Sequence, residues 1–312
     1  MVQIIAFSFN RAMQLDALLT SLIEKWKAPK YKIDVVYNYT TDEFGKGYEF
    51  LEQKFKKKAV TLHKESTLKS DKVTFSEIFV IDNWVRLYRY PKLRNPISDF
   101  RSILINIIEQ TIAENVMFLT DDSMFISDVD IPIEDLNWIN EKPEHRQFSL
   151  RLGKGESILP ATIDVNDTYC QWNMYAHSKS WGYPFSVDAH LYNKHFILKL
   201  FKKLLFYNPS TLEGYIVGTV RRHKLLAEGR CFTDIKMLTF PINIVQTCVD
   251  NLSQNVSVEM LNKRYLEGET LKYIVKSNLE PPKQYTDKLL FTDRNGKEII
   301  INISTEQNRL NV

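Results

Sequence analysis

An α/β fold with a parallel sheet is predicted, because β-prone runs and an amphipathic helix alternate at the start of the chain. Residues 2–7 form a β-prone run, and apolar residues from Leu15 to Trp26 then recur at helical spacing. Further β-prone runs cover residues 33–40 and 60–66. A strand, a helix and a strand in this order are typical of parallel strands joined by a crossover.

The composition is that of a globular protein. Of the 312 residues, 44% are hydrophobic and 25% are charged, which is ordinary for a chain that buries a core. The net charge of +3 is too small to indicate nucleic-acid binding. Cys170, Cys231 and Cys248 form neither a disulfide framework nor a metal-binding pattern. Without a recognisable signal peptide or membrane-spanning run, a cytoplasmic location is expected.

Further elements are predicted after the opening strands. A helix capped by Ser98 covers residues 97–115 and leads into a strand at 116–119. The remaining predictions are a strand at 148–153, helices at 194–206, 211–228 and 258–268, and a hairpin at 289–303 that turns at Asn295 and Gly296.

Two adjacent acids, Asp121 and Asp122, end the apolar strand in NVMFLTDDSMF, residues 115–125. In open α/β sheets, ligands bind at the carboxyl ends of the strands. Carboxylates at that edge suit Mn2+ or Mg2+. The alternative is that Asp-Asp-Ser is turn chemistry without a ligand.

The acid pair, the stretch SFNRAMQLDALLTSL at 8–22 and PSTLEG at 209–214 together resemble bacterial, family-2-like glycosyltransferases of the GT-A fold. The resemblance implies a Rossmann-like mixed sheet flanked by helices over residues 1–250. Its donor-binding half would cover about 1–130 and its acceptor half about 131–250, followed by a small helical and hairpin extension at 251–312.

The activity implied by this resemblance is sugar transfer from a nucleotide-diphospho-sugar to a hydroxyl of a saccharide or lipid-linked acceptor, with inversion, in bacterial surface polysaccharide synthesis. Asp122 would bind the metal, and Asp121 would reach the sugar or a metal-bound water. Thr120 departs from the family pattern, because it stands where the first acid of the acidic triplet usually lies.

Donor contacts are expected in the loop after the first strand and at the second strand. The resemblance assigns Ser8, Asn10, Arg11 and Gln14 to the nucleotide, with Tyr37 beside the base or ribose. In the alternative interpretation, Asn10 only caps the following helix and Arg11 is a solvated residue of its first turn.

Arg101 is a further donor candidate, because it lies in the first turn of a predicted helix, where the helix dipole disfavours a cation. An anionic diphosphate would offset that cost. An ion pair with Asp99 or another acid would do so equally.

Glu213 is the candidate general base that deprotonates the acceptor hydroxyl. The alternative is a helix capping box, in which Glu213 reaches back to the backbone of Ser210. Gly214 follows Glu213 where the family more often has an Asp.

The acceptor side is expected around Trp181, Asp188 and His190, since aromatic faces pack against sugar rings. The alternative places the aromatic side chains in the core. His190 or His223 could complete a metal shell, although a lone His is more often structural. The basic amphipathic helix at 194–206 suits either a peripheral membrane contact or core packing with its lysines in solvent.

Two other functions compete with glycosyl transfer. A nucleotidyltransferase or another phosphate-handling enzyme would also use paired acids and a metal, but the glycine-rich phosphate loops of such enzymes are absent from the sequence. A non-catalytic carbohydrate-binding or scaffold protein would use Asp121 and Asp122 only to end a strand.

Overall fold

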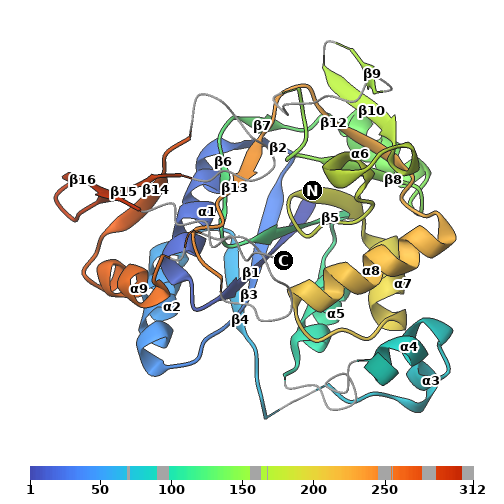
Figure 1. The fold of residues 1–312 in the computed structure, drawn as a ribbon, viewed down its shortest axis with the longest axis horizontal. Coiled ribbons are helices and arrows are strands. Elements are labelled where there is room, and N and C mark those ends of the chain that lie inside the picture. Colours follow the sequence, from blue (N-terminus) through green and yellow to red (C-terminus); the bar gives the residue numbers. More distant parts are fainter. Residues whose placement is uncertain are drawn as a thin grey trace, which may run out of the picture.

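The computed structural model describes residues 1–68, 71–89, 98–154, 163–166, 168–244, 254, 256–275 and 286–303. Within these residues, a nine-stranded sheet forms the centre of the molecule (Figure 1). In spatial order its strands are β4 (Val60–Lys64), β3 (Tyr31–Asn38), β1 (Val2–Phe9), β5 (Asn115–Thr120), β11 (His190–Asn193), β8 (Arg146–Ser149), β12 (Glu228–Phe232), β10 (Tyr169–Asn173) and β9 (Asp164–Val165).

Strand β1 lies between β3 and β5 and runs parallel to both. All but its last residue are buried, as expected of a central strand covered on both faces. Ser8 pairs with Tyr37 on β3, and Phe7 pairs with Thr120 on β5. The carboxyl ends of the three strands therefore lie side by side at one edge of the sheet. Beyond β5 the sheet becomes mixed, because β11 is antiparallel to β5.

Helices cover both faces of the sheet. Neighbouring residues of β1 point to opposite faces, so Ile4 and Ile5 belong to two different core clusters. One cluster is covered by α1 (Ala12–Lys25), α2 (Asp42–Phe55), α6 (Ile133–Glu141) and α9 (Val258–Leu266). The other is covered by α5 (Phe100–Gln110), α7 (Lys194–Lys203) and α8 (Pro209–His223).

Two short helices, α3 (Phe75–Ile78) and α4 (Ile81–Arg89), lie at the periphery beside α7 and α8 (Figure 1). The 3-10 turns are η2 (Met174–Ala176) and η3 (Lys179–Gly182). Small paired strands are β2 (Trp26–Ala28) with β7 (Val129–Asp130), and β6 (Ser123–Phe125) with β13 (Met237–Thr239).

The C-terminal elements share the core of the main sheet. Strands β14 (Thr270–Tyr273), β15 (Lys288–Thr292) and β16 (Glu298–Asn302) form an antiparallel sheet beside α1 (Figure 1). Leu271, Tyr273, Leu289 and Phe291 are buried in the same cluster as the apolar face of α1. The expected C-terminal extension is therefore packed directly on the first helix.

The predicted α/β fold, a mixed sheet flanked by helices, is confirmed. Several boundary predictions are wrong. The helix expected over 97–115 covers only Phe100–Gln110, because the backbone becomes extended at Thr111, and the strand expected at 148–153 is β8, which ends at Ser149. The helix expected to reach residue 228 ends at His223, because Lys224 adopts a left-handed conformation with φ of 50°. The residues from Glu228 onwards then form β12. The predicted C-terminal hairpin is present, and Gly296 at its turn has φ of 80°.

Two of the three cysteines are neighbours. Cys170 on β10 and Cys231 on β12 lie opposite each other in register, and both are buried and outside any disulfide. Cys248 lies outside the described residues. Across the described part of the chain, no helix is both long enough and apolar enough to span a bilayer.

Candidate functional site

The shared edge of β1, β3 and β5 carries the polar residues that follow each strand. After β1, Asn10 adopts a left-handed conformation with φ of 57°. Its side-chain oxygen accepts a hydrogen bond of 2.9 Å from the backbone N–H of Thr40, in the loop after β3. This bond connects the loop after β1 to the loop after β3, and α1 begins two residues after Asn10. Asn10 therefore fixes the backbone that carries Arg11.

Arg11 joins the β1 loop to the acid pair that follows β5. Its Nη1 lies 2.9 Å from Asp121 Oδ1 and 3.6 Å from Asp122 Oδ2. The second oxygen of Asp121 accepts a hydrogen bond of 3.3 Å from the backbone N–H of Phe9. Both Asp121 oxygens are thus occupied by β1 and its loop. Arg11 is buried and is not the solvated first-turn residue of the alternative interpretation.

Asp122 is held differently from Asp121. Its backbone carbonyl accepts a hydrogen bond of 2.7 Å from Phe240, and its side chain is 15% exposed. Asp122 Oδ1 is buried and has no hydrogen-bond partner among the described residues. Burial raises the pKa of Asp122 to about 6, against the opposing effect of Arg11 and with the charges of Asp121 and Asp188 adding to the rise.

Asp188 connects the acid pair to the second half of the chain. Its Oδ1 accepts a hydrogen bond of 2.7 Å from Thr120 Oγ1, at the end of β5. Its Oδ2 lies 3.0 Å from Arg151 Nη1. The Asp188 side chain remains 17% exposed, so part of it can still contact a ligand.

Glu213 lies in the first turns of α8, and its carboxylate turns towards the loop before β11. Its Oε1 accepts a hydrogen bond of 3.1 Å from the backbone N–H of Val187, the neighbour of Asp188. The capping-box interpretation of Ser210 is wrong, because the helix cap is Asn208, whose side chain accepts from Thr211. Glu213 is therefore free of a capping role.

The electrostatic environment of Glu213 favours its protonated form. Burial raises its pKa to about 7, and the charge of Asp188 adds to the rise. The bond from Val187 and the charge of Arg151 oppose it. A carboxylate with a pKa near neutrality can accept and release a proton under physiological conditions.

The remaining residues expected at the donor side lie around the same loop. Ser8 Oγ is 2.7 Å from the hydroxyl of Tyr48, whose ring stacks on that of Tyr37 with 4.4 Å between centroids. Gln14, on α1, accepts a hydrogen bond of 3.1 Å from the side chain of Asn243. Ser8, Gln14 and Tyr48 are buried, and Tyr37 is half-buried.

Three residues of this site come from the last part of the chain and were not predicted from the sequence. The backbone carbonyl of Asn243 accepts a hydrogen bond of 2.5 Å from Arg11. Phe240 stacks on Tyr273 of β14 at 4.3 Å. The hydroxyl group of Tyr273 is buried, which raises its pKa, and the nearby charge of Asp122 adds to this rise. No local pattern in the sequence marks these residues, because only the fold brings them to α1.

Several buried polar atoms at this site have no hydrogen-bond partner among the described residues. They include Arg11 Nε, Asp122 Oδ1 and Asn243 Oδ1. Buried polar groups are nearly always paired with protein, water or a ligand. Donors and acceptors left open side by side are therefore a sign of a polar ligand or water site.

Arg101 is not part of this group. Its Nη2 pairs with Glu77 at 2.6 Å, and its guanidinium also donates to the carbonyls of Phe201 and Lys202 at the end of α7. The unfavourable position at a helix start is thus offset by an acid and by the negative end of another helix. This is the ion-pair alternative, with Glu77 in place of Asp99.

Trp181 and His190 present no free surface to an acceptor. Trp181 is 4% exposed and packs edge-on against Trp172 with 4.8 Å between centroids. The ring nitrogens of His190 lie 2.9 Å from Ser149 Oγ and 2.9 Å from Gln147 Oε1. Burial holds the pKa of His190 well below its usual value. Of the three residues expected on the acceptor side, Asp188 alone reaches the site.

A divalent metal would find one open carboxylate here, Asp122. Among the residues that the structure describes, no group of three or more His, Cys, Asp or Glu side chains is arranged to hold a metal ion. Both His190 and the exposed His223 lie outside any such group. Mg2+ can bind through one or two carboxylates, with the remaining ligands from water and substrate phosphates. The residues fit a metal that shares its ligands with a phosphate-bearing molecule.

Comparison with protein-family models finds no match for the chain, and comparison with curated proteins finds none either.

Solved structures with related architecture include S. aureus TarS, with a TM-score of 0.42 and 13% identity over 76% of this chain and 36% of TarS. A shorter TarS chain in complex with UDP-GlcNAc has a TM-score of 0.41 and 14% identity over 76% of this chain and 57% of that one. A Pyrobaculum calidifontis mannosyltransferase in complex with GDP-Man and Mn2+ has a TM-score of 0.36 and 14% identity, with coverages of 64% and 46%. The chain thus spans about a third to three fifths of the TarS chains. Similarities at this level carry no argument about activity.

Proposed function

We propose that this protein is a glycosyltransferase that moves a sugar from a nucleotide-diphospho-sugar to a hydroxyl of a saccharide or glycolipid acceptor. The observation that carries the proposal is that two carboxylates, Asp122 and Glu213, lie near Asp188 in different environments. The charge of Asp188 raises the pKa of both. Asp122 keeps an unpartnered oxygen beside Arg11, whereas Glu213 has its pKa raised to about 7. One acid is suited to bind a cation–phosphate group and the other to transfer a proton.

In this proposal the donor lies along the edge of β1, β3 and β5. Ser8, Asn10, Gln14 and Tyr37 surround the nucleoside, and Arg11 holds Asp121 in place and adds positive charge near the diphosphate. A divalent metal, Mn2+ or Mg2+, bound through Asp122 would neutralise the diphosphate leaving group. Asp121 has both oxygens occupied, so its role in the proposal is to position Arg11.

Glu213 acts as the general base in the proposed reaction. Its carboxylate takes the proton of the acceptor hydroxyl, whose oxygen forms a bond to the anomeric carbon while the bond to the diphosphate breaks. A single displacement of this kind inverts the configuration of the sugar. Asp188, which is partly exposed, lies on the acceptor side. A role in bacterial surface polysaccharide synthesis belongs to the same proposal.

Thermal-shift measurements with a panel of nucleoside diphosphates, with and without Mn2+, test the donor site. We expect one nucleotide to stabilise the protein, more strongly with metal, and Asp122→Ala to remove the metal-dependent part. Asp128→Ala is the matched control, since its side chain is 60% exposed. No stabilisation by any nucleotide of the panel would contradict the proposal and favour a scaffold protein.

The released product separates the proposed reaction from nucleotidyl transfer. A glycosyltransferase releases a nucleoside diphosphate from its donor, whereas a nucleotidyltransferase releases pyrophosphate from a nucleoside triphosphate. Once the nucleotide is known, the parent protein should release the diphosphate from the matching sugar donor. Glu213→Gln should bind the same nucleotide with unchanged affinity and lose transfer to the acceptor.

A further inference from the structure

Three polar side chains of the helices α3 and α4 are turned inward. Asp82 of α4 lies 2.5 Å from Arg222 and 3.6 Å from Lys203. Asn83 donates to the carbonyls of Glu77 and Lys203 and accepts a hydrogen bond of 3.2 Å from Leu205. These three polar residues, Glu77, Asp82 and Asn83, are buried. Hydrogen bonds and ion pairs therefore fasten this helical pair to α5, α7 and α8.

Five large apolar or aromatic side chains of the same segment face solvent. The exposed residues are Phe75 at 78%, Phe79 at 61%, Ile81 at 78%, Trp84 at 58% and Tyr88 at 83%. A surface helix normally turns its apolar stripe to the core and its charges to water. The pair α3–α4 has the opposite arrangement. Large exposed apolar patches on a soluble fold mark interaction sites.

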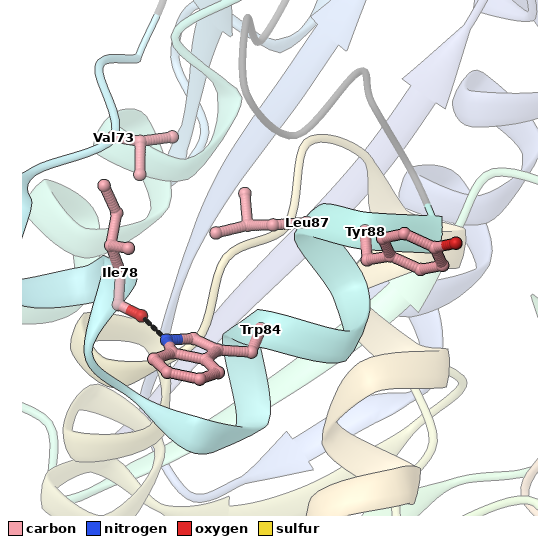
Figure 2. Close-up of a pocket in the computed structure, with 5 residues that line it drawn as sticks. All are labelled: Val73, Ile78, Trp84, Leu87 and Tyr88. Atoms are coloured by element: carbon pink, nitrogen blue, oxygen red, sulfur yellow. Dashed lines mark hydrogen bonds between the residues drawn. The ribbon is translucent and has the colours of Figure 1, made fainter.

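An apolar pocket opens within this patch. It has a volume of about 580 Å³ and is lined by Val73, Ile78, Trp84, Leu87 and Tyr88 (Figure 2). Trp84 Nε1 donates a hydrogen bond to the carbonyl of Ile78, which holds the indole at the side of the pocket (Figure 2). The floor continues into the cluster of Leu205 and Tyr207. The pocket can receive an apolar group without any change in the fold.

Charged residues of both signs lie beside the patch, with basic ones in excess. Lys72 precedes Val73, which lines the pocket, and Lys203 and Arg222 contact Asp82 of α4; all three cations are exposed, the last two at 47% and 55%. Asp71 is half-buried, Asp82 is buried between Lys203 and Arg222, and Glu77 is buried in an ion pair with Arg101. The exposed surface is therefore apolar and aromatic, with a net positive charge among the charged residues named here.

We propose that α3 and α4 dock the protein on the surface of an anionic lipid bilayer. Trp and Tyr favour the interface between headgroups and acyl chains, and the net positive charge beside the patch matches the negative headgroups. The apolar side chains then enter the upper acyl region, as in helices that lie in a membrane surface. Of the two interpretations of the basic helix at 194–206, α7 fits core packing, since Phe196, Ile197 and Phe201 are buried. This inference does not depend on the proposed glycosyl transfer.

Cosedimentation of the full chain with vesicles tests the proposal. We expect binding to phosphatidylcholine vesicles that contain phosphatidylglycerol, weaker binding to phosphatidylcholine alone, and loss of binding in high salt. The double substitution Trp84→Ser/Tyr88→Ser should weaken binding to the anionic vesicles about tenfold or more. Circular dichroism and thermal unfolding of the variant check that it is folded.

A matched pair of exposed isoleucines distinguishes binding through the patch from non-specific hydrophobic adsorption to vesicles. Ile81→Ser removes an isoleucine of the patch that is 78% exposed, and Ile112→Ser removes one elsewhere that is 86% exposed. Ile81→Ser should weaken vesicle binding, and Ile112→Ser should leave it unchanged. Equal effects of both, or no sedimentation with anionic vesicles, would overturn the proposal. So would a lipid-independent dimer that dissociates on Trp84→Ser/Tyr88→Ser, since the patch would then bind a second copy.

Discussion

Thr120 donates a hydrogen bond of 2.7 Å to Asp188, although the two residues are 68 positions apart in the chain. Thr120 stands where an acid is expected in an acidic triplet, and Asp188 brings a carboxylate to that place from the loop before β11. The departure at Thr120 therefore does not leave the site short of negative charge. The carboxylate comes from a residue 68 positions later in the chain.

Asp188→Asn should lower the pKa of Glu213, because the charge of Asp188 adds to the rise caused by burial. Activity that requires deprotonated Glu213 should then appear at lower pH than in the parent. The measurement is kcat/KM for sugar transfer as a function of pH. Asp128→Asn, at an exposed position, should leave the profile in place. An unshifted profile for Asp188→Asn would show that the charge of Asp188 does not affect the pKa of Glu213.

Glu213→Gln should stabilise the fold at alkaline pH while removing activity. The folded-state pKa of Glu213 is about 7, above the ordinary value of 4.5 that applies to the unfolded chain. Its contribution to stability is therefore present below the unfolded pKa and is lost as pH rises through the folded pKa. Relative to the parent, the variant should gain about 3 kcal/mol in the free energy of unfolding between acidic and alkaline conditions.

Urea unfolding of the parent and of Glu213→Gln, followed at a series of pH values, checks this expectation. In the parent, the acid limb of the activity profile should have an apparent pKa of about 7. A stability difference that does not change with pH would show that Glu213 is not perturbed by burial.

Arg101→Gln should reduce stability and leave nucleotide binding intact. It leaves the buried Glu77 without its partner, which costs about 3 kcal/mol for a pair of this kind. The nucleotide affinity should stay within about twofold of the parent, a change of less than half a kcal/mol. Arg11→Gln is the comparison, because Arg11 adjoins both Asp121 and Asp122. Loss of nucleotide affinity in Arg101→Gln but not in Arg11→Gln would reverse the two assignments.

Phe240→Ala should destabilise the protein by about 3–5 kcal/mol, because a fully buried ring is lost. The substitution also removes the stack on Tyr273. Phe50→Ala is the matched control: Phe50 also contacts a C-terminal aromatic ring, Tyr265, but is 40% exposed. Urea unfolding measures both variants, and similar losses would contradict a special role for Phe240.

Local patterns in the sequence predicted part of the first half of the fold, but not α2, α3, α4 or α6. Periodicity marks β1 and α1, and the apolar run before Asp121 marks β5, so the acids could be placed at a strand end. The ion pair of Arg11 with Asp121 joins residues 110 positions apart, and such distances leave no trace in periodicity. Trp181 and His190 were expected at the site because their side chains suit it chemically, but burial decided their position. The cap of α8 was also predictable, because Asn is a preferred cap residue, but the predicted cap was Ser210 and the observed one is Asn208.

Tyr273 and Asn243 lie late in the chain, whereas Arg11 lies near its beginning. A ribosome delivers the chain from the N-terminus, and early segments can fold before later ones emerge. Asp121 and Asp122 can meet Arg11 while the residues around Tyr273 are still unmade. During that interval Asp122 lacks the backbone hydrogen bond from Phe240 and the neighbouring hydroxyl of Tyr273. The finished environment of Asp122 is therefore acquired only after the chain has been made as far as Tyr273.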